Sequence, residues 1–251
     1  MNGLIPLLKK EILEQIRTHR LLIVASVFVF FGITTPLLLK YLPEIIKLSG
    51  ENVDINFPAP TVAMSLSEYA GTIGQTGVLV AVLIAMGAVA NELQRGTALM
   101  VLSKPVKRSA FVTAKFAAMN LTFLASLAIA SIFCFVYTAI LIGGSRVMPF
   151  IGENLLLALF LAFCIAVTLL FSCVFKSGVA AGGIAIGILI GQGVISSIPY
   201  VGDYMPGKLL AWGTALVGGV DKTYVPATIV TVVLTVLCLF LAQRILDTRE
   251  I

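Results

Sequence analysis

The sequence predicts an all-α, polytopic membrane protein with six transmembrane helices. Hydrophobic residues make up 59% of the 251 residues, charged residues make up 12%, and the mean hydropathy is +1.06. A soluble domain has about 25% charged residues because it must cover a water-facing surface. This chain has too few for that purpose. It also contains six apolar runs, each long enough for a bilayer crossing, which takes about 20 helical residues.

The six runs cover residues 21–39, 71–90, 116–142, 155–175, 179–198 and 224–242. Inside hydrocarbon the backbone must satisfy its own hydrogen bonds, so each run is predicted to be a helix. Only three residues, Lys176-Ser177-Gly178, separate the fourth run from the fifth, and these two helices must therefore be antiparallel neighbours. The other connections are too short to bury a core of their own. Residues 1–251 are therefore predicted to form a single membrane domain.

The distribution of basic residues predicts the orientation. If the N-terminus lies inside, 12 of the 17 Lys and Arg residues fall on inner segments. This bias places both termini in the cytoplasm and the chain in the plasma membrane. The net charge of +5 then reflects topology and anionic headgroups, and no nucleic-acid partner is expected.

The segment before the first run, within residues 1–20, is predicted to be an amphipathic interfacial helix. Its apolar residues recur at helical spacing: Ile5, Leu8, Ile12 and Ile16. Its charged residues fall opposite them: Lys10, Glu11, Glu14 and Arg17. Such a helix lies flat on the inner membrane face. The alternative is a flank that serves only to orient the first span.

The segment between the second and third runs, residues 91–115, is longer than a connector needs to be. Four consecutive apolar residues, 99–102, are predicted to face the cytosol, beside the basic residues Arg95, Lys104, Lys107 and Arg108. An exposed apolar patch with a polar rim is typical of a docking surface, and Pro105 should end the short helix before it. The alternative is a basic loop whose leucines dip into the membrane interface.

The same segment contains Glu92, Gly96-Thr97, the leucines Leu99 and Leu102, Pro105, Arg108-Ser109 and Lys115. In these features it resembles the corresponding loop of ABC-2 type transporter permeases. The acidic residue common just after Gly-Thr is replaced by Ala98 and Leu99. With the N-terminal helix and the six-helix layout, the resemblance covers essentially the whole chain.

The resemblance implies a connecting helix at the N-terminus and a coupling helix, after the second span, that is seated in an ATPase. It also implies a pump of two permeases and two ATPases. The residues assigned to ATPase coupling are Glu92, Arg95, Gly96, Thr97, Leu99, Leu102, Lys104, Pro105 and Arg108.

The chain has no G-x-x-x-x-G-K-[S/T] motif, so ATP hydrolysis needs a separate chain. The chain is therefore not expected to be an enzyme or to hold a metal or cofactor, and ATP and Mg²⁺ are expected to bind the partner. No charged residue is expected in the middle of a span, whereas ion-coupled carriers usually have them there. An ATP-independent carrier or scaffold remains the alternative from another class.

The fifth run has Gly183, Gly187 and Gly191 on one helix face, and glycines four apart let helices approach closely. One reading is a seam between two permeases along the substrate path, and the other is close packing within one chain. Gln192 and Gln75 are the polar side chains assigned to the same path.

Residues 199–223 have an apolar middle that is too short to cross the bilayer. They resemble the short re-entrant outer helices that the family places before its last span. A path of such apolar segments favours the export of an amphipathic or hydrophobic substrate, and the resemblance to small exporters of the family implies that the substrate is a peptide, toxin or antibiotic. A sodium or lipid exporter is the alternative within the family.

Overall fold

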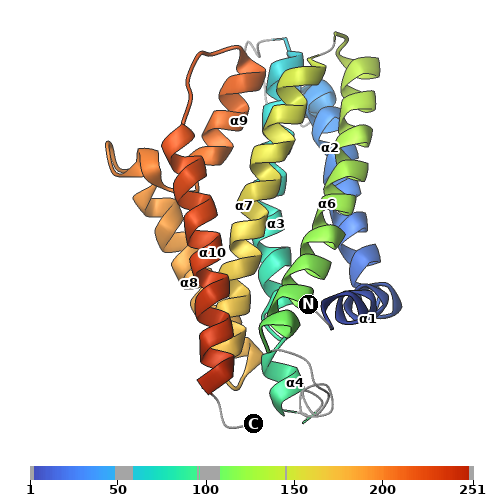
Figure 1. The fold of residues 1–251 in the computed structure, drawn as a ribbon. Coiled ribbons are helices and arrows are strands. Elements are labelled where there is room, and N and C mark those ends of the chain that lie inside the picture. The colour runs from blue at the N-terminus through green and yellow to red at the C-terminus, as the bar shows by residue number, and fades with distance from the viewer. Residues whose placement is uncertain (1–2, 49–58, 95, 97–107, 145, 249–251) are drawn as a thin grey trace.

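The computed structural model describes residues 3–48, 59–94, 96, 108–144 and 146–248, and every regular element among them is a helix. In chain order these are α1 (Leu4–Arg17), α2 (Arg20–Leu48), α3 (Val62–Ala85), α4 (Ala90–Gln94), α6 (Arg108–Leu141), α7 (Val147–Val174), α8 (Gly178–Ile195), the 3-10 turn η1 (Gly202–Tyr204), α9 (Lys208–Gly218) and α10 (Val225–Thr248). Figure 1 shows an upright bundle with α1 lying across one end, where α4 and the last turns of α10 also lie. We call this the α4 end, and the opposite end the α9 end.

Six helical segments are long and apolar enough to cross a membrane, which confirms the predicted number. Their bounds are Arg20–Ile45, Val62–Gln94, Arg108–Leu141, Val147–Val174, Gly178–Ile195 and Val225–Thr248. Three of them begin well before the predicted runs, because a helix continues past the apolar stretch that marks it in the sequence. As a result two carboxylates, Glu68 of α3 and Glu153 of α7, lie inside membrane-spanning helices. The sequence analysis, which expected no charged residue in the middle of a span, did not predict that either carboxylate belongs to a membrane-spanning helix.

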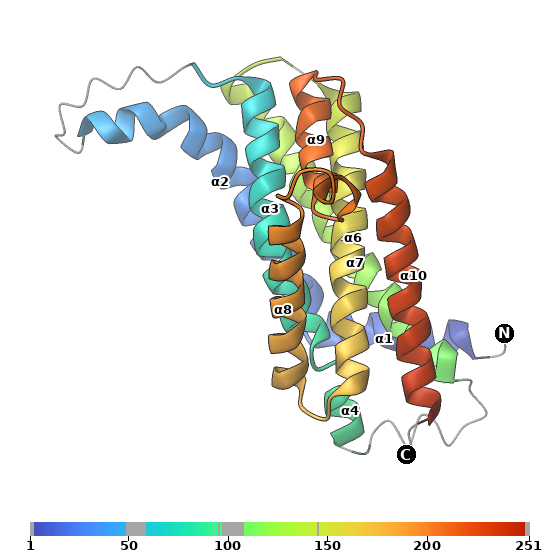
Figure 2. The ribbon, with the colours of Figure 1, turned by 90° about the vertical axis from the view of Figure 1, so that its left-hand side faces the viewer.

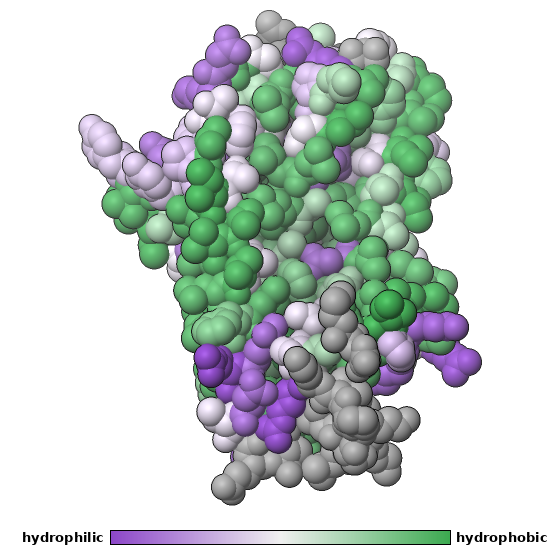
Figure 3. Space-filling view, viewed as in Figure 1, coloured by the Kyte–Doolittle hydropathy of each residue, from purple (hydrophilic) through white to green (hydrophobic). Residues whose placement is uncertain are grey.

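Helix α7 is at the centre of the bundle and contacts α3, α6, α8, α9 and α10. The side chains of Leu161, Ile165 and Leu169 follow one another along it, and all three are fully buried. The bundle surface is apolar as well: Ile140 is 74% exposed and Val236 is 60% exposed. Figure 3 shows this apolar surface over the middle of the molecule, with polar groups gathered toward the ends. Such a surface suits a lipid environment rather than water.

Helix α2 is held against α6 and then bends away from the bundle. At Gly32 an added Cβ would lie 2.7 Å from the carbonyl oxygen of Ala130, so only glycine permits this approach. Pro36 follows one turn later, and Pro43 lies further on within the same helix. Proline has no N–H to donate and its ring displaces the preceding turn, which kinks a helix. Figure 2 shows the last part of α2 leaning out from α3.

Helix α9 is the apolar segment predicted to be a short outer helix, and it lies beside α3 and α7 without crossing the bundle. Its last turn is capped by Arg146, whose Nη1 donates to the Val217 carbonyl oxygen at 2.9 Å. Gly213 lets α9 approach α7, because a Cβ there would lie 2.9 Å from Cγ of Glu153. The chain then leaves α9 at Gly219, which has a left-handed φ of 74°.

Candidate functional site

The amphipathic pattern of α1 is confirmed, but its polar face contacts protein. The buried residues Leu7, Glu11 and Gln15 are spaced one helical turn apart, and α1 lies against α6. Ile5 and Ile16, by contrast, are 78% and 51% exposed. The apolar face of α1 is therefore partly exposed, with Leu8 and Ile12 half-buried, while Glu11 is buried against the bundle.

Lys115 of α6 explains why Glu11 is buried. This lysine is only 2% exposed, and its Nζ lies 3.1 Å from both carboxylate oxygens of Glu11. The same Nζ lies 2.7 Å from Oε1 of Glu92 on α4 and 5.0 Å from the ring centre of Phe111. A buried ammonium group is tolerated only when opposite charges and hydrogen bonds replace water. Lys115 thus joins α1, α4 and α6, and we call this contact the three-helix junction.

Lys10 closes the junction from its solvent side. Its Nζ lies 3.0 Å from Glu11, 3.2 Å from Glu14 and 3.7 Å from Glu92. Burial alone would lower the pKa of Lys10, but the carboxylates of Glu11, Glu92 and Glu14 outweigh it and raise that pKa. Burial would raise the pKa of the Glu14 carboxyl, and Lys115 and Lys10 lower it instead.

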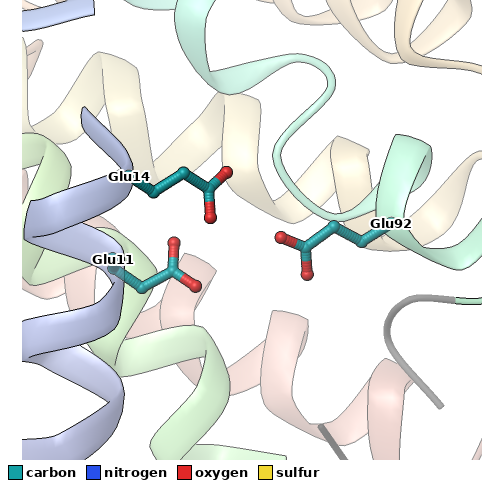
Figure 4. A group of neighbouring side chains, drawn as sticks. All are labelled: Glu11, Glu14 and Glu92. Carbon is teal, nitrogen blue, oxygen red and sulfur yellow. The ribbon is translucent and has the colours of Figure 1, made fainter. Parts of the chain in front are cut away.

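Figure 4 shows the three carboxylates of Glu11, Glu14 and Glu92 converging from α1 and α4. Their nearest oxygens lie within 4.8 Å of one another, a spacing that also suits a metal ion. Here the ammonium groups of Lys10 and Lys115 already lie within hydrogen-bonding distance of these carboxylates. The arrangement is therefore best described as an ionic joint between helices.

The short helix α4 is capped at its start by a side chain of α7. The Ser172 hydroxyl of α7 accepts hydrogen bonds from the backbone N–H groups of Val89 and Ala90 at 3.0 and 3.1 Å. A helix start leaves such donors without intrahelical partners, so a hydroxyl there acts as a cap. At the other end the chain leaves α4 through Gly96, whose left-handed φ of 69° favours glycine. Ser172 has no signal in the sequence, since it is one of two hydroxyl residues, with Thr168, within a long apolar helix.

Arg108 ties the first residue of α6 to the end of α10. Its Nη1 donates to the carbonyl oxygens of Leu246 and Asp247 at 2.6 and 3.2 Å. These carbonyls belong to the last turn of α10, where a cation is favourable. Glu92 and Arg108 therefore anchor the two helices, α4 and α6, that precede and follow residues 97–107.

Three of the residues predicted to couple to a partner are described by the structure: Glu92, Gly96 and Arg108. The remaining six lie outside the described residues: Arg95, Thr97, Leu99, Leu102, Lys104 and Pro105. Lys115 entered the sequence analysis only as part of a motif, and the structure places it at the centre of the junction. Glu11, 104 residues earlier in the chain, is the partner that the sequence analysis missed.

Residues 5–202 match the family model described as ABC-2 family transporter protein. The chain belongs to the ABC-2 transporter family. It is therefore a permease, the membrane component of an ABC transporter. It is also similar to the uncharacterized transmembrane protein YxlG of Bacillus subtilis (strain 168), with 25% identity over 213 residues, which are 83% of this chain and 83% of that relative.

The glycine stripe of the permease lies on an open face of α8. A Cβ added at Gly183, Gly187 or Gly191 would meet no other atom within 4 Å among the described residues. Among the described residues, therefore, no close packing against these glycines within one chain is seen. Gly182, on the adjacent face, is the residue that packs internally, because a Cβ there would lie 2.8 Å from the sulfur of Met86.

The two predicted path glutamines differ in environment. Gln75 is exposed on α3. Gln192 is half-buried near Gly207, where a Cβ would lie 2.9 Å from its Nε2. That nitrogen has no hydrogen-bond partner among the described residues. The structure therefore places Gln192 beside the chain that enters α9, and leaves Gln75 on the surface of the bundle.

Proposed function

We propose that this permease pairs with a second copy of itself and with two separate ABC ATPase subunits to form an exporter. The observation on which the proposal rests is the three-helix junction. Through Lys115 it connects the N-terminal helix, the helix that leads into residues 97–107 and the third membrane span. A force applied to that loop would therefore reach three elements at once.

The orientation that we propose puts the α4 end in the cytoplasm. The excess of Lys and Arg on the segments at this end supports it. The partly exposed apolar face of α1 supports it too, because a helix lying across the end of a bundle can rest on the inner leaflet. ATP binding would bring the two ATPases together, and α4 and α6 would move with the docked loop. Both termini are cytoplasmic in this arrangement, and the membrane is the plasma membrane.

The proposed pairing of two permeases rests on α8. Its glycine stripe is open, and such a stripe in a membrane helix lets another helix approach closely. Within the described residues no other helix occupies it. A second permease copy would fill this surface and place α8 of each copy beside the central path.

The proposed substrate is amphipathic or hydrophobic: a peptide, a toxin or an antibiotic. The exposed side chains of the spans are overwhelmingly apolar, among them Leu79 and Leu83 of α3 and Ile188 and Ile190 of α8. A path bounded by such side chains offers little to replace the hydration shell of a sugar or a small ion.

The test is retention of the ATPase on an affinity-tagged permease purified from native membranes. Leu99→Asp combined with Leu102→Asp should abolish copurification of an ATP-binding cassette subunit, because apolar anchors at the centre of a docked surface contribute most of the binding energy. Lys107→Gln is the matched control, since a charge at the rim acts mainly on encounter and salt dependence. Normal ATPase retention by the double variant would contradict the proposal and leave the loop as a simple connector.

A further inference from the structure

A cavity of about 640 Å³ lies between α2 and α3, toward the α9 end of the bundle. Its walls include Phe31, Leu38 and Leu39 of α2 and Met64, Glu68 and Thr72 of α3. Leu38 and Met64 are 57% and 47% exposed, so the cavity is accessible from the surface. Its volume is within the range of about 300–1,000 Å³ that is typical of small-molecule sites.

The cavity exists because of two residues in α2. Gly32 holds the first part of the helix against Ala130 of α6, and Pro36 bends the helix one turn later. Proline leaves the carbonyl four residues before it without its helical hydrogen bond, which in α2 is the carbonyl of Gly32. Figure 2 shows the later part of α2 diverging from α3. The groove is thus a consequence of the sequence of α2 and does not require a bound molecule to open it.

The α2 wall of the groove is almost wholly apolar in character. Its two hydroxyls are both satisfied within the helix: Thr34 donates to the Phe30 carbonyl oxygen and Thr35 to that of Phe31, each at 2.7 Å. Neither hydroxyl hydrogen is therefore available to a ligand. Hydrophobic contact is the main interaction that α2 offers.

Glu68 is the one charged residue among those that line the groove. It lies about 9 Å along the helix axis from Val62, at 1.5 Å per residue. Among the described residues no Lys, Arg or His comes within ion-pair distance of it. A carboxylate on a membrane-spanning helix is costly unless a cation or water meets it, and such a residue marks a functional site.

We propose that this groove binds the transported substrate and that the substrate is a lipophilic cation, with an apolar body and a basic group. The inference rests on the proposed transport function and adds the substrate's charge and its place of binding. The apolar wall of α2 contacts the body of the molecule. The Glu68 carboxylate, which is exposed on α3 beside the groove, pairs with its basic group.

The experiment measures binding of rhodamine 6G to the permease in lipid nanodiscs by fluorescence anisotropy, with empty nanodiscs subtracted. Rhodamine 6G is a lipophilic cation, and its hydrolysed free acid is a matched zwitterion of nearly the same size. The native permease should bind the ester about tenfold more tightly than the free acid, which corresponds to one charge interaction with Glu68. In Glu68→Gln this ratio should fall to about one to two, because the side-chain shape is kept and the charge is lost.

Two further variants separate the parts of the groove. Phe31→Ala should weaken the ester and the free acid equally, since it removes apolar wall and no charge. Glu44→Gln, which changes an exposed acid of α2 outside the lining, should leave both affinities within about twofold of the native values.

Two results would overturn the inference. One is an absence of saturable rhodamine 6G binding by the native permease, as expected if a second copy of the chain fills the groove. The other is an ester-to-acid ratio that is the same in Glu68→Gln as in the native permease. Neither result touches the proposed function, because ATPase retention is measured without dye.

Discussion

Replacing Lys115 with methionine tests whether the three-helix junction holds the N-terminal helix in place. Methionine keeps the length and the apolar stem of lysine and removes only the charge. Glu11, which is 3% exposed, would then lie buried beside Glu92 without the ammonium group that now contacts both. Like charges in such proximity repel, and the buried carboxylate has lost its main partner.

The expected loss follows from the surroundings of Glu11. Breaking a buried ion pair by removing one partner costs about 3–5 kcal/mol. Lys10 stays 3.0 Å from Glu11 and offsets part of that loss, so we expect about 3 kcal/mol for the docking of α1 on α6. This corresponds to roughly a hundredfold increase in the fraction of molecules with α1 undocked.

The assay is hydrogen exchange of peptides from residues 4–17, read by mass spectrometry on the permease in nanodiscs, because local opening sets the exchange rate. Lys9→Met is the matched control, because it removes a charge from an exposed position of the same helix. It should change the exchange rate of α1 by less than about twofold. Adding Glu11→Gln to Lys115→Met should restore part of the protection, because it removes the buried charge. Exchange of α1 in Lys115→Met within about fivefold of the native rate would refute the reasoning.

Three further predictions concern the same end of the bundle and the face of α8. Arg108→Gln removes charge-assisted hydrogen bonds to the last carbonyl oxygens of α10, and it should speed hydrogen exchange at the end of α10 by about tenfold or more without affecting α1. Equal exchange at the end of α10 in the variant and the native permease would show that Arg108 does not stabilise that helix end. Gly187→Leu should lower the fraction of crosslinked permease dimer by about tenfold, whereas Ala128→Leu, at an exposed position of α6, should lower it much less. Equal dimer fractions in the two variants would contradict the proposal that two permeases pair through α8. Because the pKa of Glu14 is lowered in the folded protein, its ion pairs stabilise α1 fully above pH 4.5, its ordinary pKa, and this contribution is lost as the pH falls through the lowered pKa. Because the pKa of Lys10 is raised in the folded protein, its ion pairs stabilise α1 fully below pH 10.5, its ordinary pKa, and this contribution is lost as the pH rises through the raised pKa. Protection of α1, corrected for intrinsic exchange, should therefore be constant between about pH 6 and 9, and a change within that window would contradict the assignment.

The sequence was a sound guide wherever a property depends on neighbouring residues. Hydropathy located six spans because each is a continuous apolar run, and the 3.6-residue period found α1. The same reasoning mistook the ends of the spans, because a helix persists beyond its apolar stretch. For this reason Glu68 and Glu153 were not recognised as residues of membrane-spanning helices. The glycine stripe of α8 was found, but whether it faced a neighbour or open space is not a property of α8 alone.

The sequence by itself determined that this chain is a membrane protein with an amphipathic first helix, six spans and a basic, partly apolar loop. The fold decided which side of α1 is buried, because that choice depends on Lys115, 104 residues after Glu11. The fold also decided that α2 and α3 part to leave a groove beside Glu68, through a glycine contact with α6 and a proline kink. The hydropathy pattern along a chain predicts which segments lie in lipid and which lie in water. Ion-pair partners and cavities depend instead on how segments that are distant in sequence pack against one another.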